Sequence, residues 1–361
     1  MGPGALRLRV AVASEVQAWF EPIAMSIVPT PPEPLEPPTR AAPAGRYPII
    51  DAARAAALVA MASYHTLWDL GFLRLTAENY ALTAAGHRAA ETIAGTFLTL
   101  VGVGLVLMNG RGIRPRQTVL RLARIGGAAL LVTLGTWIAF PDAYVFFGIL
   151  HCIAVSSVLG LPFLFAPLAV TALAAVAVFA MPLLVHASLL DDPILFFLGL
   201  GSGTPRTNDY VPLFPWFGFV LSGIVLGRLG LPRLARSRFG NWTPRSALGR
   251  AATFLGRHSL IVYLVHQPVL LGLLTGLVTL TGPNPMAGLR AFRADYVTIC
   301  SRTGGEPPLC RIAARCTSDA LLKEDLFRED GRPFSPAERS RAQALSQGCY
   351  GAIEAASRMP R

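Results

Sequence analysis

The hydrophobic pattern of this chain consists of long apolar runs separated by short polar segments. A run of about 20 apolar residues is long enough to cross a bilayer as a helix. Seven runs fit this description, at 47–75, 92–109, one ending near 140, 144–165, 168–186, 212–229 and 254–280. A further apolar piece, ILFFLGLG, is a candidate re-entrant segment. The pattern predicts an all-α integral membrane protein with a bundle of about seven transmembrane helices.

Two polar segments flank the predicted transmembrane domain, 47–282. Residues 1–46 include the run PTPPEPLEPP, whose prolines exclude helix and sheet, so we expect a disordered Pro-rich leader. This leader lacks the apolar core and small-residue cleavage site of a signal peptide. Residues 283–361 form a tail of mixed charge. The sequence therefore predicts three regions, with the membrane domain in the middle.

The charge pattern predicts the orientation of the chain. Hydrophobic residues make up 53% of the sequence, and the net charge of +11 comes almost wholly from arginine. Two Arg-rich loops without acidic residues, at 111–124 and 228–257, lie between apolar runs. The positive-inside rule explains such loops better than nucleic-acid binding does, and we expect no nucleic-acid partner. With seven spans, we expect a cytoplasmic N-terminus and an exported C-terminus. The protein would lie in the inner (plasma) membrane, in contact with its lipids.

The cysteines support an exported tail. Four of the five lie in the tail, and their spacings lack the CxxC pairs of most zinc sites, so we expect no metal. Disulfides form in exported compartments, and four cysteines allow three pairings. We therefore predict two disulfides among Cys300, Cys310, Cys316 and Cys349, and a packing role for Cys152 in its span.

The first apolar run carries an unusual polar stripe. Asp51, Arg54, His65 and Asp69 each cost several kcal/mol in hydrocarbon unless they are paired or face a polar cavity. Arg54 and His65 are eleven residues apart, about three helical turns, and so share a face. Asp69 follows His65 by four residues, close enough to hold the imidazole. The stripe indicates a catalytic or ligand-binding helix, or a structural polar network.

Further polar residues lie in or beside later spans. We expect an anionic donor to meet cations at the cytoplasmic mouth, and His65 to act as a base for a hydroxyl or amine acceptor from outside. Helical periodicity places Ser259, Tyr263 and His266 on one face. His151 is equally a site residue or a packing residue, and Asp209 lies at the outer mouth or in a loop. The candidates beyond the first span are Arg257, His258, His151, Asp209, Ser259, Tyr263 and His266.

Four ordered motifs resemble a known family. The R-x10-H spacing from Arg54 to His65 resembles transmembrane acyltransferases of the acyltransferase-3 type. Together, IIDAARAAALVAMASYHTLWDL, FFGILHCIAVS, DYVPLFPWFGFVLSGIVLG and LGRHSLIVYLVHQP resemble the bacterial relatives of heparan-alpha-glucosaminide N-acetyltransferase, over roughly 46–280. The resemblance implies acetyl-CoA or another acyl-CoA as cytoplasmic donor, a carbohydrate-like acceptor, and catalytic His65 with Arg54 as its partner. The heparan enzyme's catalytic loop is not recognisable, so its sugar is not carried over.

These observations predict an acyl-CoA-dependent acyltransferase that modifies a glycan or lipid-linked sugar outside the membrane. Two other classes also fit the polar residues. A transporter or flippase would line its pathway with the stripe, although inverted repeats and broken helices do not stand out. A haem or quinone protein would use His65, His151 or His266 as ligands. The acceptor, the acyl chain and the oligomeric state stay open.

Overall fold

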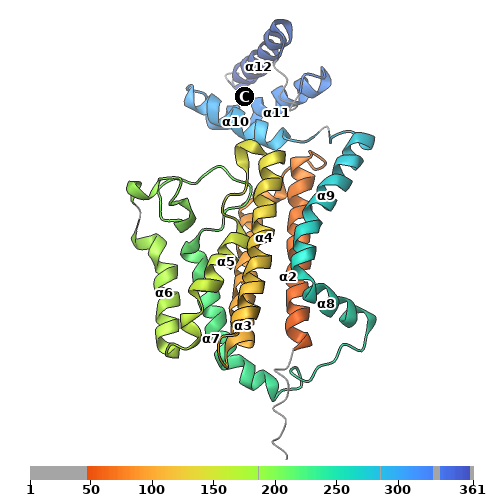
Figure 1. The fold of residues 1–361 in the computed structure, drawn as a ribbon. Coiled ribbons are helices and arrows are strands. Elements are labelled where there is room, and N and C mark those ends of the chain that lie inside the picture. The colour runs from red at the N-terminus through yellow and green to blue at the C-terminus, as the bar shows by residue number, and fades with distance from the viewer. Residues whose placement is uncertain (1–46, 186, 285, 328–333, 358–361) are drawn as a thin grey trace, which may run out of the picture. The chain divides into compact units, whose positions relative to one another are not determined.

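The apolar runs fold as helices in a computed structural model that describes residues 47–185, 187–284, 286–327 and 334–357 (Figure 1). Every regular element within these ranges is helical, which confirms the all-α class. The predicted leader, 1–46, lies outside the described residues. The membrane domain contains α2 Pro48–Phe72, α3 Ala84–Asn109, α4 Pro115–Ala139, α5 Ile149–Leu159, α6 Leu168–Leu184, α7 Leu213–Ala235, α8 Ala247–Arg257 and α9 Ser259–Thr281.

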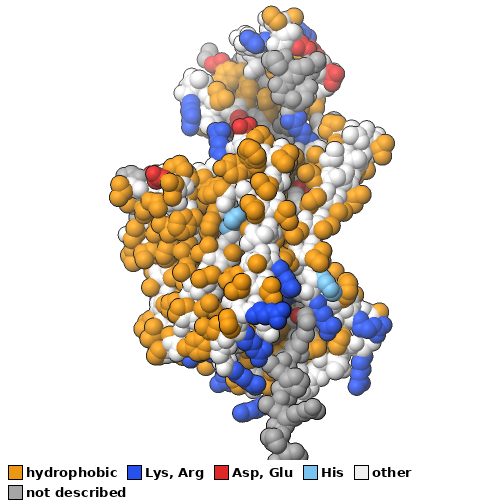
Figure 2. Space-filling view, in the orientation of Figure 1, with side chains coloured by type: hydrophobic (Ala, Val, Ile, Leu, Met, Phe, Trp, Pro, Cys, Tyr) orange, Lys and Arg blue, Asp and Glu red, His pale blue; other side chains and the backbone are white. Residues whose placement is uncertain are grey.

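Four of the described helices are long and apolar enough to cross a membrane by length and composition: α3, α4, α7 and α9. Helices α5 and α6 are shorter apolar helices, and α2 is a 25-residue helix that carries the polar stripe. Large apolar side chains are exposed on the outward faces of these helices, such as Leu131 on α4 and Leu173 on α6. Figure 2 shows hydrophobic side chains over much of the visible surface of the bundle, as expected for helices that face lipid. The chain is a multi-pass membrane protein.

Two predicted spans have different boundaries in the structure. The fourth, expected at 144–165, is helical only over α5, because the chain before Gly148 is a loop and Pro162 starts a short 3-10 turn. The seventh, expected at 254–280, is divided at His258 into α8 and α9. The apolar piece ILFFLGLG forms only a 3-10 turn, Phe196–Leu198, which ends at Gly199 with a φ of 76°.

Helices α3 and α7 cross at close range within the bundle. A Cβ added to Gly102 would collide with the backbone of Val220, and one added to Gly223 would collide with Thr99. Small residues permit such close approach between membrane helices, where packing rather than water exclusion drives association. Leu98, Val220 and the neighbouring core side chains are fully buried beside this crossing.

Both Arg-rich connections, from α3 to α4 and from α7 to α8, lie at the end of the bundle where α2 begins (Figure 1). Figure 2 shows the blue basic side chains gathered at this end. We call it the inner end. The loop from α2 to α3 and the end of α9 lie at the opposite, outer end (Figure 1).

The described part of the tail contains three helices, α10 Leu289–Arg302, α11 Pro307–Lys323 and α12 Pro336–Ser357. Two disulfides join them, as the sequence predicted, and the pairing is Cys300 with Cys310 and Cys316 with Cys349. Arg341 of α12 donates two hydrogen bonds to Glu324, at 2.7 and 2.6 Å, and so lowers the pKa of that carboxyl.

Three contacts tie the start of the tail to the loop that follows α2. The Asn284 amide donates to the Arg74 carbonyl at 2.8 Å, and the Gly288 amide donates to the Ala77 carbonyl at 3.2 Å. Arg290 forms an ion pair with Glu78 at 2.7 Å. The tail therefore begins beside the outer end of the helix that carries His65.

Candidate active site

The polar stripe of α2 faces α9, but its internal pairing differs from the prediction. Asp69 is fully buried, and its Oδ1 accepts a hydrogen bond of 2.7 Å from Gln267 Nε2 of α9. Its Oδ2 has no hydrogen-bond partner among the described residues. The expectation that Asp69 holds the His65 imidazole is therefore wrong: the neighbouring helix supplies a better-placed donor than the residue four positions away.

His65 meets His266 instead. Their ring centres lie 5.0 Å apart and their planes are inclined by 60°. His266 Nδ1 lies 2.6 Å from the carbonyl oxygen of Tyr263, and a carbonyl can only accept, so we assign the proton of a neutral His266 to Nδ1. The Nε2 atom is buried and has no hydrogen-bond partner among the described residues. His266 thus carries a lone pair on Nε2.

Tyr263 packs beside His266 on α9. Its ring centre is 5.7 Å from that of His266, so these two residues share a face as predicted. Asp209 is near enough to interact electrostatically with Tyr263. The Asp209 carboxylate also accepts a hydrogen bond of 2.9 Å from the Ile149 amide, where α5 begins, and anions are stabilised at helix N-termini. Ser259, seven residues before His266, lies about 10 Å nearer the inner end.

Both ring nitrogens of His151 are engaged by the protein. Nδ1 accepts from the Gly148 amide at 3.3 Å, and Nε2 lies 3.2 Å from the hydroxyl of Thr133. That hydroxyl donates to the Val145 carbonyl at 2.7 Å, so it accepts the proton carried by His151 Nε2. Of the two interpretations of His151, this geometry favours the packing role.

Asp51 organises the inner end of the site. It is 1% exposed, and its carboxylate lies 3.1 Å from Arg54 Nη1 and 3.7 Å from Arg257 Nε. Helix α8 packs so closely on α2 that a Cβ on Gly256 would collide with the backbone of Asp51. Arg121 of α4 is near enough to interact electrostatically with Arg54. Two guanidinium groups thus lie beside one buried carboxylate, and a third lies near Arg54.

His258 stands apart from this cluster. It is the exposed junction between α8 and α9, where its Nδ1 lies 2.9 Å from the Phe254 carbonyl and its ring packs on Phe254 at 4.4 Å. The predicted inner-mouth pair is therefore divided: Arg257 reaches Asp51, and His258 fixes the junction. Cys152 is buried beside Ser156, consistent with packing.

Two residues of this arrangement, Gln267 and Arg121, were not among the sequence candidates. Asp51 was part of the predicted polar stripe, but its contacts with two arginines were not predicted. A signal existed for Gln267, since an amide at membrane depth needs a partner. Arg121 was indistinguishable from its neighbours in the basic loop. The site as a whole offers a cationic inner end and, about three turns farther along α2, two adjacent imidazoles.

Comparison with known proteins covers the same part of the chain. A family model described as heparan-alpha-glucosaminide N-acetyltransferase, catalytic, matches residues 46–268. The match begins just before α2 and ends just after His266 and Gln267, so it contains both ends of the site and none of the tail. No curated protein and no solved structure matches the chain.

Proposed function

Because this chain belongs to the heparan-alpha-glucosaminide N-acetyltransferase catalytic family, we propose that it is a membrane acyltransferase. It moves an acetyl or related acyl group from cytoplasmic acyl-CoA to a carbohydrate-like acceptor, a glycan or lipid-linked sugar, on the outer side. The observation that carries this proposal is the contact of His65 with His266 at 5.0 Å, within the segment that matches the family. A base is what acyl transfer to a hydroxyl or amine requires.

The inner end suits the donor. CoA carries phosphate groups, and guanidinium groups bind phosphate through paired hydrogen bonds. Arg54 and Arg257 lie beside the Asp51 carboxylate at this end, and Arg121 lies near Arg54, so three guanidinium groups are available within one part of the bundle. We assign Asp51 the role of orienting Arg54 and Arg257. The same end carries the Arg-rich loops, which supports a cytoplasmic donor.

The outer part suits the transfer step. The acceptor oxygen or nitrogen attacks the thioester carbonyl carbon, a C–O or C–N bond forms, and the C–S bond breaks. His65 takes the proton from the acceptor and returns it to the departing thiolate, which leaves as the CoA thiol. His266 supports this role electrostatically, because protonating two rings 5.0 Å apart at once brings like charges together. His65 is thereby kept available as a neutral base.

The hydrogen bond from Gln267 to Asp69 positions the two histidines. It joins α9 to α2 within about one turn of both His65 and His266. A hydrogen bond to a charged or strongly polar group in a dry interior is worth more than one at a surface. We therefore assign Asp69 a positioning role in place of the direct support of His65 that the sequence suggested.

The geometry argues against a haem protein. The rings of His65 and His266 contact each other, whereas two axial ligands face one another across a porphyrin. His151, the third candidate ligand, uses both ring nitrogens within the protein. The transporter alternative makes a different prediction, because transport leaves the donor thioester intact.

The test uses sealed membrane vesicles and acetyl-CoA labelled in the acetyl group. We expect label on a lipid or glycan fraction when the acetyl-CoA has access to the cytoplasmic face of the membrane. We expect no label when the acetyl-CoA reaches the opposite face alone. His65→Ala should abolish the labelling, and His87→Ala, at an exposed position on α3, should leave it unchanged. Wild-type protein that moves solutes and leaves the thioester intact would refute the enzymatic proposal.

A further inference from the structure

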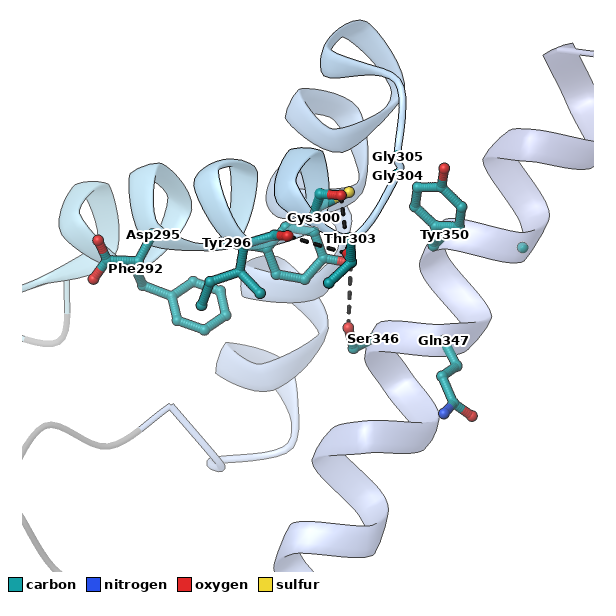
Figure 3. Close-up of a pocket in the computed structure, with 12 residues that line it drawn as sticks. Phe292, Asp295, Tyr296, Cys300, Thr303, Gly304, Gly305, Ser346, Gln347 and Tyr350 are labelled. Atoms are coloured by element: carbon teal, nitrogen blue, oxygen red, sulfur yellow. Dashed lines mark hydrogen bonds between the residues drawn. The ribbon is translucent and has the colours of Figure 1, made fainter.

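The tail contains a groove that the family match does not reach. It has a volume of about 740 Å³ and lies between α10, the turn at 303–305 and α12 (Figure 3). Its walls contain both aromatic rings and polar groups, with Phe292, Asp295 and Tyr296 on one side and Ser346, Gln347 and Tyr350 on the other. A concave, partly aromatic surface with a few polar groups is the usual form of a small-ligand site.

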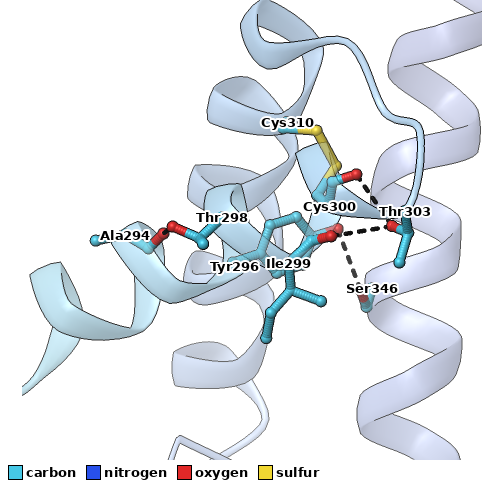
Figure 4. The surroundings of a disulfide bond; sticks show 8 residues. All are labelled: Ala294, Tyr296, Thr298, Ile299, Cys300, Thr303, Cys310 and Ser346. Atoms are coloured by element: carbon cyan, nitrogen blue, oxygen red, sulfur yellow. Dashed lines mark hydrogen bonds between the residues drawn. A yellow bond between two sulfur atoms is a disulfide. The ribbon is translucent and has the colours of Figure 1, made fainter.

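The groove has a rigid framework. The Cys300–Cys310 disulfide lies beneath the turn, and a Cβ on Gly305 would collide with both sulfur atoms. The Ser346 hydroxyl donates to the Tyr296 hydroxyl at 3.2 Å, which links α12 to α10 (Figure 4). Thr303 donates to the carbonyls of Ile299 and Cys300, so the end of α10 is also fixed. The walls are held before any ligand arrives.

The chemistry of the walls fits a carbohydrate. A sugar ring has apolar C–H faces and a rim of hydroxyls, so it needs flat aromatic surfaces together with donors and acceptors. Tyr296 and Tyr350 provide such surfaces, the exposed Asp295 carboxylate accepts, and the Gln347 amide both donates and accepts. An acyl chain would leave Asp295 and Gln347 without function. The mixed lining therefore favours a sugar over a lipid.

The position of the tail gives the site a use. Its two disulfides fit an exported compartment, and its first residues are bound to the loop after α2, at the outer end of the His65 helix. We propose that this groove binds a carbohydrate chain, namely a part of the acceptor distant from the atom that receives the acyl group. The role as an acceptor site rests on the proposed function, whereas carbohydrate binding itself does not.

Two glycines on α12 provide a matched test. A Cβ at Gly351, in the groove wall, or at Gly348, off that face of the helix, meets no atom within 4 Å. Gly351→Trp should fill the groove, and Gly348→Trp should not. We would titrate the full-length chain in nanodiscs with a β-1,4-linked N-acetylglucosamine tetramer and with maltotetraose, by calorimetry. At least one should bind wild type and Gly348→Trp alike, and bind Gly351→Trp at least tenfold more weakly.

A second variant keeps the test independent of a single bulky side chain. Tyr350→Ala removes one aromatic face and should weaken binding about tenfold, while Ile312→Ala, on the exposed face of α11, should leave binding unchanged. Non-reducing peptide mapping of each variant confirms that both disulfides have formed. Failure of wild type to bind either probe, or equal binding by wild type and Gly351→Trp, would overturn the inference.

Labelled acetyl transfer measured on the same preparations separates the two proposals. Transfer without tetrasaccharide binding removes the groove inference and leaves the acyltransferase. Binding without transfer leaves the carbohydrate groove and removes the acyltransferase.

Discussion

The imidazole rings of His65 and His266 lie 5.0 Å apart, although α2 and α9 are the first and last described helices of the membrane domain. The hydrogen bond between Asp69 and Gln267 joins the two helices near these rings. Within α9, the Tyr263 carbonyl orients the His266 ring. The proposed reactive centre therefore depends on the interface between these two helices. Residues on either helix should affect it separately.

Replacing His65 should stop catalysis and leave donor binding intact. A general base contributes about 10²–10⁴-fold in rate. His65 lies about 16 Å along α2 from Arg54, so His65→Ala should lower the transfer rate by that factor with little change in CoA affinity. Initial rates per folded molecule, with CoA binding measured beside them, check this. A rate equal to that of wild type would end the catalytic assignment.

Replacing His151 should lower the stability of the protein and leave catalysis largely intact. Its ring nitrogens bind Thr133 and Gly148 at the start of α5, and neither nitrogen forms a hydrogen bond with His65 or His266. His151→Ala should lower the thermal unfolding midpoint, because it leaves the Thr133 and Gly148 groups without this partner. Transfer per folded molecule should change less than tenfold. A loss as large as that of His65→Ala would return His151 to the reactive centre.

The inner arginines should control the donor. Arg54→Ala removes a guanidinium that the Asp51 carboxylate orients, so we expect the KM for acyl-CoA to rise with a smaller change in kcat. Asp51→Asn should raise the KM as well, since it weakens the alignment of both Arg54 and Arg257. Arg88→Ala, on the outer part of α3, is the control. Unchanged donor affinity in Arg54→Ala would assign Arg54 to structure.

The bond between Asp69 and Gln267 should be measurable as a coupling energy. A hydrogen bond contributes about 0.5–1.5 kcal/mol between neutral groups and about 1.5–3 kcal/mol when one group is charged. We expect the double-mutant cycle of Asp69→Ala and Gln267→Ala to give a coupling of that size in unfolding free energy. Additive effects of the two substitutions would show that the contact does not hold the helices together.

The two tail disulfides should contribute unequally to stability. They close segments with sequence separations of 10 and 33 residues. Chain-entropy arguments give about 3 kcal/mol for the shorter loop and about 4 kcal/mol for the longer. Cys316→Ser with Cys349→Ser should thus destabilise the tail more than Cys300→Ser with Cys310→Ser, as the protease resistance of the tail would report. The reverse order would show that native contacts outweigh loop length.

Sequence periodicity predicted those parts of the site that lie on one helix. Tyr263 and His266 share a face because their spacing fixes it, and α2 follows from its long apolar run. The break at His258 was not predicted, although the residues around it, Arg257, His258 and Ser259, are polar. The pairing of the tail cysteines was not visible either, because spacing alone does not decide between three arrangements.

Contacts between helices account for the main error at the site. Asp69 is four residues from His65, and local spacing favours that pair. Asp69 binds Gln267 instead because α9 packs on the same face of α2, and no pattern within α2 reveals that packing. The same holds for Asp51 and Arg257, whose contact depends on the break that turns α8 back onto the start of α2.

The Asp69–Gln267 contact can form only late in the synthesis of the membrane domain. The two residues are 198 positions apart, so at 5–20 residues per second the ribosome reaches Gln267 about 10–40 s after Asp69. Helix α2 must wait in the translocon or the lipid for that time with its carboxyl group lacking this partner. A chain that stalls before α9 therefore carries a buried acid without its amide, a feature by which membrane quality control could distinguish unfinished copies from finished ones.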